Sequence, residues 1–123
     1  DPRIRTVEHI KRLIIGLVHQ QDNRLRTNLS QSLATECRHD YGTLSKLFSE
    51  TQGTTIEKYF IAQKIERAKE LLDYGELTLN EIADRLNYSS TAHLSAQFKA
   101  QTGYTPRQYR QQKERARIPL DKI

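Results

Sequence analysis

The sequence has 123 residues, of which 36% are hydrophobic and 28% charged, and its formal net charge is +5. This length allows one domain, or two very small domains that share a connecting element. The longest apolar run, Leu13–Val18, is far too short to span a bilayer, and no segment resembles a secretory leader, so we expect no membrane attachment.

The first half of the chain shows the periodicity of helices and no strand pattern. A first helix is expected to end in the polar stretch "HQQDNR", a short second helix follows, and Asp40 is a suitable N-cap for a third helix. Gly53 supplies the left-handed residue that ends this third helix. The apolar residues that mark the three helices are Val7, Ile10, Ile14 and Leu17, then Leu29, Leu33 and Cys37, then Leu44, Leu47 and Phe48.

A long fourth helix is expected over about residues 55–74. Thr54, with Glu57 three positions later, forms a capping box at its start, and Tyr74-Gly75 marks its end. Its apolar face is formed by Ile56, Tyr59, Ile65, Ala68, Leu71 and Leu72. Its polar sides, which we expect to form salt bridges, hold Lys64, Glu66, Lys69 and Glu70.

The same pattern then starts again. Thr78 and Glu81 form a second capping box, which begins a fifth helix, and the turn "NYSS" leads to a sixth helix that Gly103 ends. Thr105 is a suitable N-cap with Pro106 at the first helical position, so a seventh helix begins there. The apolar residues of these helices are Leu79, Ile82, Ala83 and Leu86, then Leu94 and Phe98, then Tyr109.

The third and sixth helices are near copies of one another. The stretch "TLSKLFSETQG" recurs 50 residues later as "HLSAQFKAQTG", with leucine, serine, phenylalanine and glycine at the same places. Each copy follows a short helix and a tight turn. The chain therefore holds two helix-turn-helix figures, at about residues 28–53 and 78–103.

The sequence thus predicts an all-α fold of seven helices, in which a long connecting helix joins two helix-turn-helix subdomains in a homeodomain-like tandem. The two turns differ in length, because Ala34 and Leu44 are ten residues apart whereas Ala83 and Leu94 are eleven apart. Two reading helices about one turn of B-DNA apart, roughly 34 Å, can enter successive major grooves. We interpret the duplication as a way for one chain to enter two successive major grooves, which a helix-turn-helix dimer does with two chains.

The excess positive charge lies outside the two repeats. The net charge and a pI near 9.5 favour a polyanionic partner. Residues 1–27 hold six Lys or Arg against three acids, and residues 104–123 hold six against two. The repeats, counted over 28–53 and 76–103, each hold two basic residues against three acids, so they do not supply the general attraction.

The segment "IERAKELLDYGELTLNEIADRLNYSSTAHLSAQFKAQTGYTPRQYR" resembles the signature of the AraC/XylS family of bacterial transcription regulators. In that signature a connecting helix "R-x-x-A-x-x-L-L" precedes "I-A-x-x-x-G-F-S-x-x-x-x-F-x-x-x-F-K-x-x-x-G-x-(T/S)-P-x-x-(Y/F)-R". The resemblance covers about Leu13–Gln111, with Asn87-Tyr88 where the family has Gly-Phe. It implies one AraC-type DNA-binding domain over residues 1–123, with its core at about 13–111 and a basic tail at 112–123.

The resemblance also implies the partners. We expect sequence-specific binding of double-stranded DNA by two recognition helices in successive major grooves, with RNA polymerase as a further partner. An effector or oligomerisation domain is expected upstream, in agreement with a chain that begins at Asp1-Pro2 without Met. The single cysteine, Cys37, cannot form a disulfide within the chain, which indicates a cytoplasmic protein.

The outward faces of the third and sixth helices hold the residues expected to read bases. The resemblance places Gly42, Ser45 and Lys46 at base-facing positions, and Lys46 can donate to O6 and N7 of guanine. The small Ala92 and Ala96 can touch only a thymine methyl, so we expect the sixth helix to position the protein more than to read. The expected base-reading residues are Tyr41, Gly42, Ser45, Lys46, Ser49, Thr91, Ala92, Ser95 and Ala96.

Phosphate contacts are expected at the starts of the fourth and seventh helices, where backbone N–H groups and the positive end of the helix dipole suit an anion. The threonines at these starts can serve as N-caps whether or not they also contact a phosphate. The run Arg110–Arg117 either lies along DNA or forms a solvated tail. The expected phosphate-binding residues are Arg38, Thr54, Thr55, Lys99, Thr105, Arg107 and Arg110.

No catalytic, cofactor or metal site is expected, and we do not expect an enzyme. The four histidines are scattered, and His93, next to Leu94 on a partly buried helix, is expected to be structural. Cys37 and His39 provide two metal ligands at most, without a second pair at metal-site spacing. The sequence also lacks a glycine-rich phosphate loop and a nucleophile elbow.

The alternative to DNA binding is a helical protein-interaction module that docks on RNA polymerase or another regulator through the third and sixth helices. Such an interface requires exposed aromatic or leucine anchors. Among the outward residues of the two helices only Tyr41 qualifies, whereas the others are polar or small. The exposed faces therefore favour DNA.

Overall fold

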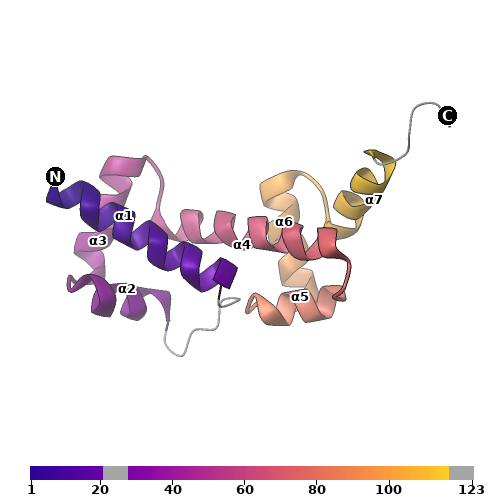
Figure 1. The fold of residues 1–123 in the computed structure, drawn as a ribbon, viewed down its shortest axis with the longest axis horizontal. Coiled ribbons are helices and arrows are strands. Elements are labelled where there is room, and N and C mark those ends of the chain that lie inside the picture. Colours follow the sequence, from indigo (N-terminus) through magenta and orange to yellow (C-terminus); the bar gives the residue numbers. More distant parts are fainter. Residues whose placement is uncertain (21–27, 117–123) are drawn as a thin grey trace. The chain divides into compact units, whose positions relative to one another are not determined.

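The computed structural model describes residues 1–20 and 28–116. Over these ranges the chain forms seven α-helices and no strand, which confirms the expected fold class (Figure 1). The helices are α1 (Pro2–Ile15), α2 (Leu29–Cys37), α3 (Tyr41–Gln52), α4 (Ile56–Tyr74), α5 (Leu79–Arg85), α6 (Thr91–Thr102) and α7 (Pro106–Ala116), with a π-helical turn, Gly16–Gln20, after α1. Most of "HQQDNR", and the expected tail from residue 117 onward, lie outside the described residues.

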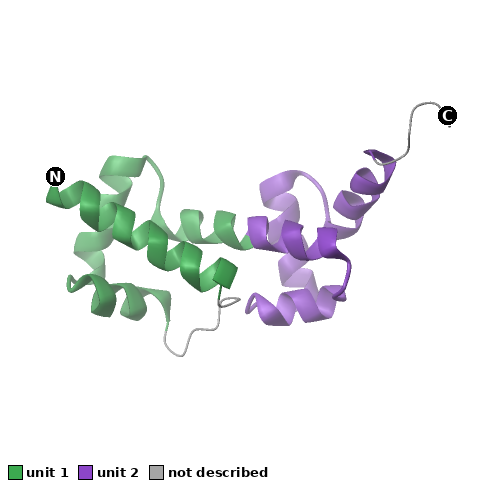
Figure 2. Ribbon diagram, in the orientation of Figure 1, with its two compact units in different colours: residues 1–64 green, residues 65–123 purple. Residues whose placement is uncertain are grey.

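The chain divides into two compact units, residues 1–64 and 65–123 (Figure 2). The first unit holds α1, α2, α3 and the start of α4, and the second holds the end of α4 followed by α5, α6 and α7. One helix therefore closes the first unit and opens the second. Both units follow the same plan of an opening helix, a helix-turn-helix figure and a closing helix.

The first unit is built around apolar side chains from each of its helices. In α1, Val7, Ile10 and Ile14 recur at helical spacing and are buried where the helix packs on α2 and α3. Burial of each such side chain contributes about 1.5–3 kcal/mol. A polar contact also joins the π-helical turn to α4, since Nε2 of His19 lies 2.8 Å from Oε1 of Gln63. The buried members of this core are Val7, Ile10, Ile14, Val18, Leu33, Leu44, Phe48 and Ile56.

The second unit has its own set of buried residues, and its α5 begins as the sequence predicts. The Glu81 N–H donates to the Thr78 hydroxyl at 3.1 Å, and the Thr78 N–H donates to the Glu81 carboxylate at 2.9 Å. This reciprocal pair confirms the second capping box. The buried hydrophobic residues of the unit are Ile65, Ala68, Leu71, Leu72, Ile82, Ala83, Leu86, Tyr88, Leu94 and Phe98.

The repeat seen in the sequence continues into the closing helices. Phe48 of α3 packs against Tyr59 of α4 with ring centroids 5.6 Å apart. Fifty residues later, Phe98 of α6 packs against Tyr109 of α7 at 5.5 Å. Because both members of each pair keep the same offset, the repeated element includes the first turns of the helix that follows.

Both recognition helices end on a left-handed glycine. Gly53 has a φ of 69° and Gly103 a φ of 86°, and each backbone N–H donates to the carbonyl four residues earlier, at 3.0 and 2.8 Å. A Cβ at either position would meet no atom within 4 Å. The glycines are therefore required by the backbone angle rather than by lack of space.

Each helix-turn-helix figure also has a left-handed residue in its turn, but here it is not glycine. Arg38, with a φ of 58°, follows α2, and Asn87, with a φ of 64°, follows α5. The N-cap of the next helix is two residues after Arg38 and three residues after Asn87. The extra residue of the second turn thus lies between its left-handed residue and its N-cap.

The longer second turn contributes a side chain to the interior. Tyr88, directly after Asn87, is buried, and its hydroxyl donates to Oε1 of Gln97 in α6 at 2.5 Å. In the first turn the residue directly after Arg38 is His39, which is exposed. The two figures therefore share their helices but differ in how the turn is anchored.

The start of α4 differs from the sequence prediction. The expected capping box of Thr54 and Glu57 is wrong, because Thr55 is the residue whose hydroxyl accepts the Lys58 N–H, at 3.0 Å. The Glu57 carboxylate instead accepts a hydrogen bond from the Tyr41 hydroxyl of α3. The carboxylate therefore joins α4 to α3, and it does not form the expected capping box with Thr54.

The polar sides of α4 also differ from expectation at one residue. Ion pairs form between Lys69 and Glu66 at 2.8 Å and between Arg67 and Glu70 at 3.1 Å. Lys64, expected on a polar, salt-bridging side of the helix, is buried, and its Nζ lies 5.3 Å from the centre of the Phe60 ring. Burial lowers the pKa of Lys64 to about 8, because the charged ammonium loses its hydration.

Replacing the two adjacent threonines separately tests which residue caps α4. Thr55→Ala removes the acceptor for the Lys58 N–H and is expected to lower the free energy of unfolding by about 1 kcal/mol. Thr54→Ala is the matched control and should change it by less than about 0.5 kcal/mol. Urea unfolding followed by circular dichroism measures both values. Equal losses, or a larger loss for Thr54→Ala, would contradict this assignment.

Candidate nucleic-acid interface

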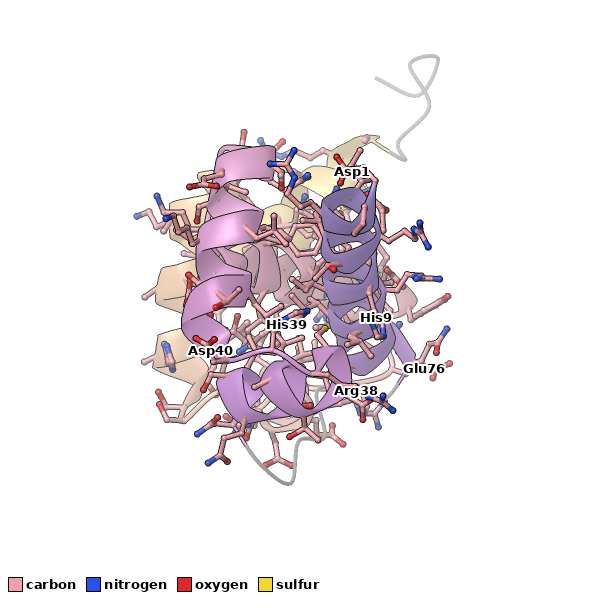
Figure 3. All side chains as sticks on the ribbon, turned by 90° about the vertical axis from the view of Figure 1, so that its left-hand side faces the viewer. Asp1, His9, Arg38, His39, Asp40 and Glu76 are labelled. Carbon is pink, nitrogen blue, oxygen red and sulfur yellow. The ribbon has the colours of Figure 1, made fainter. Side chains whose placement is uncertain are left out.

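The turn before α3 holds the start of that helix in place. Asp40 is the N-cap, since the Thr43 N–H donates to its Oδ2 at 3.1 Å and the Thr43 hydroxyl donates to its Oδ1 at 2.6 Å. These hydrogen bonds keep the pKa of Asp40 below its ordinary value. Arg38 and His39 are exposed, and Figure 3 shows them with Asp40 along the turn between α2 and α3.

The outward face of α3 is polar and small. Gly42 and Lys46 are exposed, and Ser45 and Ser49 are half-buried beside the buried Leu44 and Phe48. A Cβ at Gly42 would lie 3.2 Å from Oδ2 of the N-cap carboxylate. A larger residue at this position would therefore press on the group that fixes the start of the helix.

Tyr41 stands apart from the other expected readers on α3. Its side chain is half-buried, and its hydroxyl donates to the Glu57 carboxylate. Burial and the neighbouring carboxylate raise the pKa of Tyr41, and the same hydrogen bond lowers the pKa of Glu57. The Tyr41 hydroxyl therefore already donates its hydrogen bond within the first unit.

The outward face of α6 is smaller still. Ala92 and Ala96 are exposed, and Ser95 is half-buried. The hydroxyl of Thr91 is hydrogen-bonded to the side chain of Asn80 in α5, so this threonine ties the two helices of the figure together. Four residues of α6 are expected to read bases. Among them, only Ser95 has a side-chain hydroxyl without a hydrogen-bond partner within the described residues.

His93 of α6 is expected from the sequence to be a structural histidine, and its side-chain contacts fit that role. It is exposed, and its Nδ1 lies 3.2 Å from the Ser89 hydroxyl oxygen. Its ring meets the Tyr88 ring edge-on, with centroids 5.0 Å apart. A residue next to a buried leucine in a helix is rotated by about 100° away from it, which is the signal that predicts exposure.

The starts of α4 and α7 have the same cap and opposite charges. The Thr105 hydroxyl accepts the Gln108 N–H at 3.2 Å, as Thr55 does fifty residues earlier, and the Thr105 N–H donates to the Gln108 side chain at 2.9 Å. Two residues after each threonine the chain has Glu57 in α4 but Arg107 in α7, both exposed. At the start of α4 the charge of Glu57 is offset by the exposed Lys58, whereas the start of α7 has Arg107 and no acid.

Arg110 is less exposed than the other basic residues expected to bind phosphate. Arg38, Lys99 and Arg107 are exposed, whereas Arg110 is half-buried in a hollow that also contains Asp73 and Glu114. One of its Nη atoms is shielded from solvent and has no hydrogen-bond partner among the described residues.

The side chains of the described residues form no group of three or more His, Cys, Asp or Glu that could hold a metal ion. The Cys37 thiol of α2 lies 3.9 Å from Nδ1 of His9 in α1. Burial, with a contribution from the charge of Glu36, raises the pKa of this thiol.

Among the described helices, none combines the length and the apolar character needed to cross a membrane.

The family comparison and curated relatives agree with this architecture. A family model described as a helix-turn-helix domain matches residues 33–112. The HTH-type transcriptional activator RhaR of Cronobacter sakazakii is 38% identical over 69 residues, which cover 56% of this chain and 24% of RhaR. The xylose operon regulatory protein of Escherichia coli K12 is 37% identical over 67 residues, which cover 54% of this chain and 17% of that protein. The chain thus matches less than a quarter of the length of these relatives.

Solved structures share the fold. The C-terminal domain of AraT, a response regulator from Geobacillus stearothermophilus, superposes with a TM-score of 0.74 at 25% identity and covers 87% of this chain and 84% of that one. The DNA-binding domain of AdpA, a global transcriptional factor solved with a target DNA, has a TM-score of 0.70 at 21% identity, with 95% and 96% coverage. The family match spans well over half of the chain. The chain therefore belongs to the AraC/XylS-type helix-turn-helix family of transcription regulators.

Proposed function

We propose that the chain is the DNA-binding part of a bacterial transcription regulator and that α3 and α6 read two successive major-groove segments of one site. The observation that carries the proposal is the fifty-residue repeat. Each unit holds one recognition helix that starts at a side-chain cap, ends on a left-handed glycine and packs through one phenylalanine on the closing helix. A chain that presents two equivalent helices fits a site with two equivalent grooves.

The two helices have different tasks in this proposal. Lys46, exposed on α3, donates to base edges, while the methyl groups of Ala92 and Ala96 on α6 allow close approach and little readout. Arg107 and the first turn of α7 bind a phosphate of the second segment. The corresponding start of α4 is the weaker phosphate site, because the carboxylate of Glu57 offsets the charge of Lys58 there.

The proposal extends to partners outside the described chain. The matched segments make up 24% and 17% of the two curated relatives, which supports an effector or oligomerisation domain elsewhere in the full protein. RhaR bears the name of a transcriptional activator, which supports RNA polymerase as a second partner.

Duplex binding is expected to depend strongly on salt. Neutralisation of about five to eight phosphates gives a slope of log K against log salt of about −4.5 to −7, at roughly −0.9 per phosphate. Fluorescence anisotropy with a labelled duplex over about 50–200 mM salt measures the slope. A slope near zero would contradict DNA binding and favour the protein-interaction module.

Two substitutions distinguish reading from positioning. Lys46→Ala should relax the base preference at one position of the first segment by about 1–3 kcal/mol, since a donor to a base edge is lost. Arg107→Ala should weaken all duplexes nearly equally, since phosphates are the same in every sequence. Competition with duplexes that carry each single base change measures both effects. If Lys46→Ala left every preference intact, α3 would not be the principal reader.

A spacer in the DNA tests whether the two segments are read as one unit. An insertion of about 5 bp, half a helical turn, should move the second segment to the opposite face and reduce affinity toward that of one segment. An insertion of about a full turn should not rescue binding, because α4 runs without a break from one unit into the other. Rescue by the longer spacer would show that the units bind through a flexible connection.

A further inference from the structure

The closing helix of the second unit divides its polar side chains between two hollows. Residues three and four positions apart lie on one side of a helix, so two such series can face two different neighbours. On one side, Arg110, Lys113 and Glu114 line a hollow with the end of α4, at Leu72–Gly75. On the other side, a second hollow lies between α7 and the end of α6. Its lining includes Lys99, Tyr104, Gln108, Gln111, Gln112 and Arg115.

The hollow beside α4 has its charge largely compensated. Nζ of Lys113 lies 3.9 Å from the Asp73 carboxylate and 5.7 Å from the centre of the Tyr109 ring. Glu114 contributes a second carboxylate to the same lining. The cations on this side of α7 therefore already have acidic neighbours within their own unit.

The groove beside α6 has cations and no acids. Its seven lining residues, all within the described ranges, contain the ammonium of Lys99, the guanidinium of Arg115 and three glutamine amides. Both cations are exposed, and neither has an ion-pair partner in the described part of the chain. Cations and amide donors without a competing carboxylate suit an anionic ligand with several acceptor oxygens.

The groove is continuous with the face of α6 that is proposed to approach the bases. Lys99 follows Ala96 by three residues and Ser95 by four, so the three side chains lie along one side of the helix. The connection to α7 is held in place because the Tyr104 N–H donates to the Thr102 hydroxyl at 3.1 Å. The ring of Tyr104, 44% exposed, stands at the groove.

We propose that this groove binds the sugar–phosphate backbone of double-stranded DNA beside the second major-groove segment. The proposal rests on the proposed function. It adds Tyr104 and Gln108 to the interface, and it assigns Gln111, Gln112 and Arg115 of the run Arg110–Arg117 to the backbone beside α6. Lys99 and Arg115 neutralise phosphates, and the glutamine amides donate to phosphate oxygens. The exposed tyrosine ring packs against a deoxyribose. The contact is independent of base sequence, because it is made to the backbone alone.

The test compares Arg115→Gln with Lys113→Gln. Each substitution removes one positive charge from α7, and the two residues lie on different sides of that helix. With a duplex that carries the selected site and flanking DNA, Arg115→Gln should lower affinity about fivefold at about 0.15 M salt and reduce the salt slope by about 0.9. Phosphate-ethylation interference should disappear at a backbone position next to the second segment. Lys113→Gln should keep the interference pattern and lose less than about twofold in affinity. Circular dichroism confirms that both variants fold.

The possible outcomes separate the two proposals. Equal losses in the two variants, with unchanged interference, would overturn the groove contact and leave only a general effect of net charge. Wild-type affinity in Arg115→Gln would overturn it as well and point to an acidic protein segment as the occupant of the groove. In both of these cases DNA binding by the wild-type chain persists, so the proposed function stands. Failure of the wild-type chain to bind any selected duplex would overturn the proposed function and the groove contact together.

Discussion

Each reading helix is fastened to the helix that follows it by one aromatic contact, between Phe48 and Tyr59 in the first unit and between Phe98 and Tyr109 in the second. This contact is possible only because the chain reverses direction directly after the helix, on a glycine in the left-handed conformation. An L-residue other than glycine in that conformation is disfavoured by about 1–2 kcal/mol. The phenylalanine faces inward, and the outward face of the same helix is thereby aimed at solvent.

Identical scaffolds carry different surfaces in the two units. The buried residues and caps of α3 and α6 coincide at an offset of fifty, whereas the exposed positions diverge: Lys46 corresponds to Ala96, and Glu57 corresponds to Arg107. Packed positions diverge as well, because Leu47 corresponds to Gln97 and Ile56 to Pro106. Under the proposed function, Lys46 is directed at bases in the first unit, whereas Lys99 and Arg115 are directed at the backbone in the second. A duplicated protein can divide recognition in this way without any change to its fold.

Much of the fold could be predicted from the sequence, because helical periodicity, caps and left-handed glycines are local signals. The error at Thr54 arose where two adjacent threonines compete for one cap, and the offset of fifty from Thr105 decides in favour of Thr55. The structural role expected for His93 is compatible with its exposure, because the residue is rotated away from Leu94 and its ring contacts Tyr88. The sequence leaves open whether the run Arg110–Arg117 lies along DNA. That Arg115 and Tyr104 line one groove follows only from the packing of α7 on the end of α6. The packing of α7 beside the end of α4 likewise brings Arg110 and Asp73 into one hollow, which no spacing rule shows.

The unequal turns bear on how a duplicated gene can vary in length. The added residue of the second figure lies between Asn87 and the N-cap Ser90, outside both helices. The same addition within α6 would rotate every later side chain by about 100°, which would expose Phe98 and bury a polar neighbour. In the turn it leaves both helix faces unchanged, and Tyr88 fills the interior. Insertions and deletions that arise between the helices can therefore survive selection, whereas those inside the helices are removed.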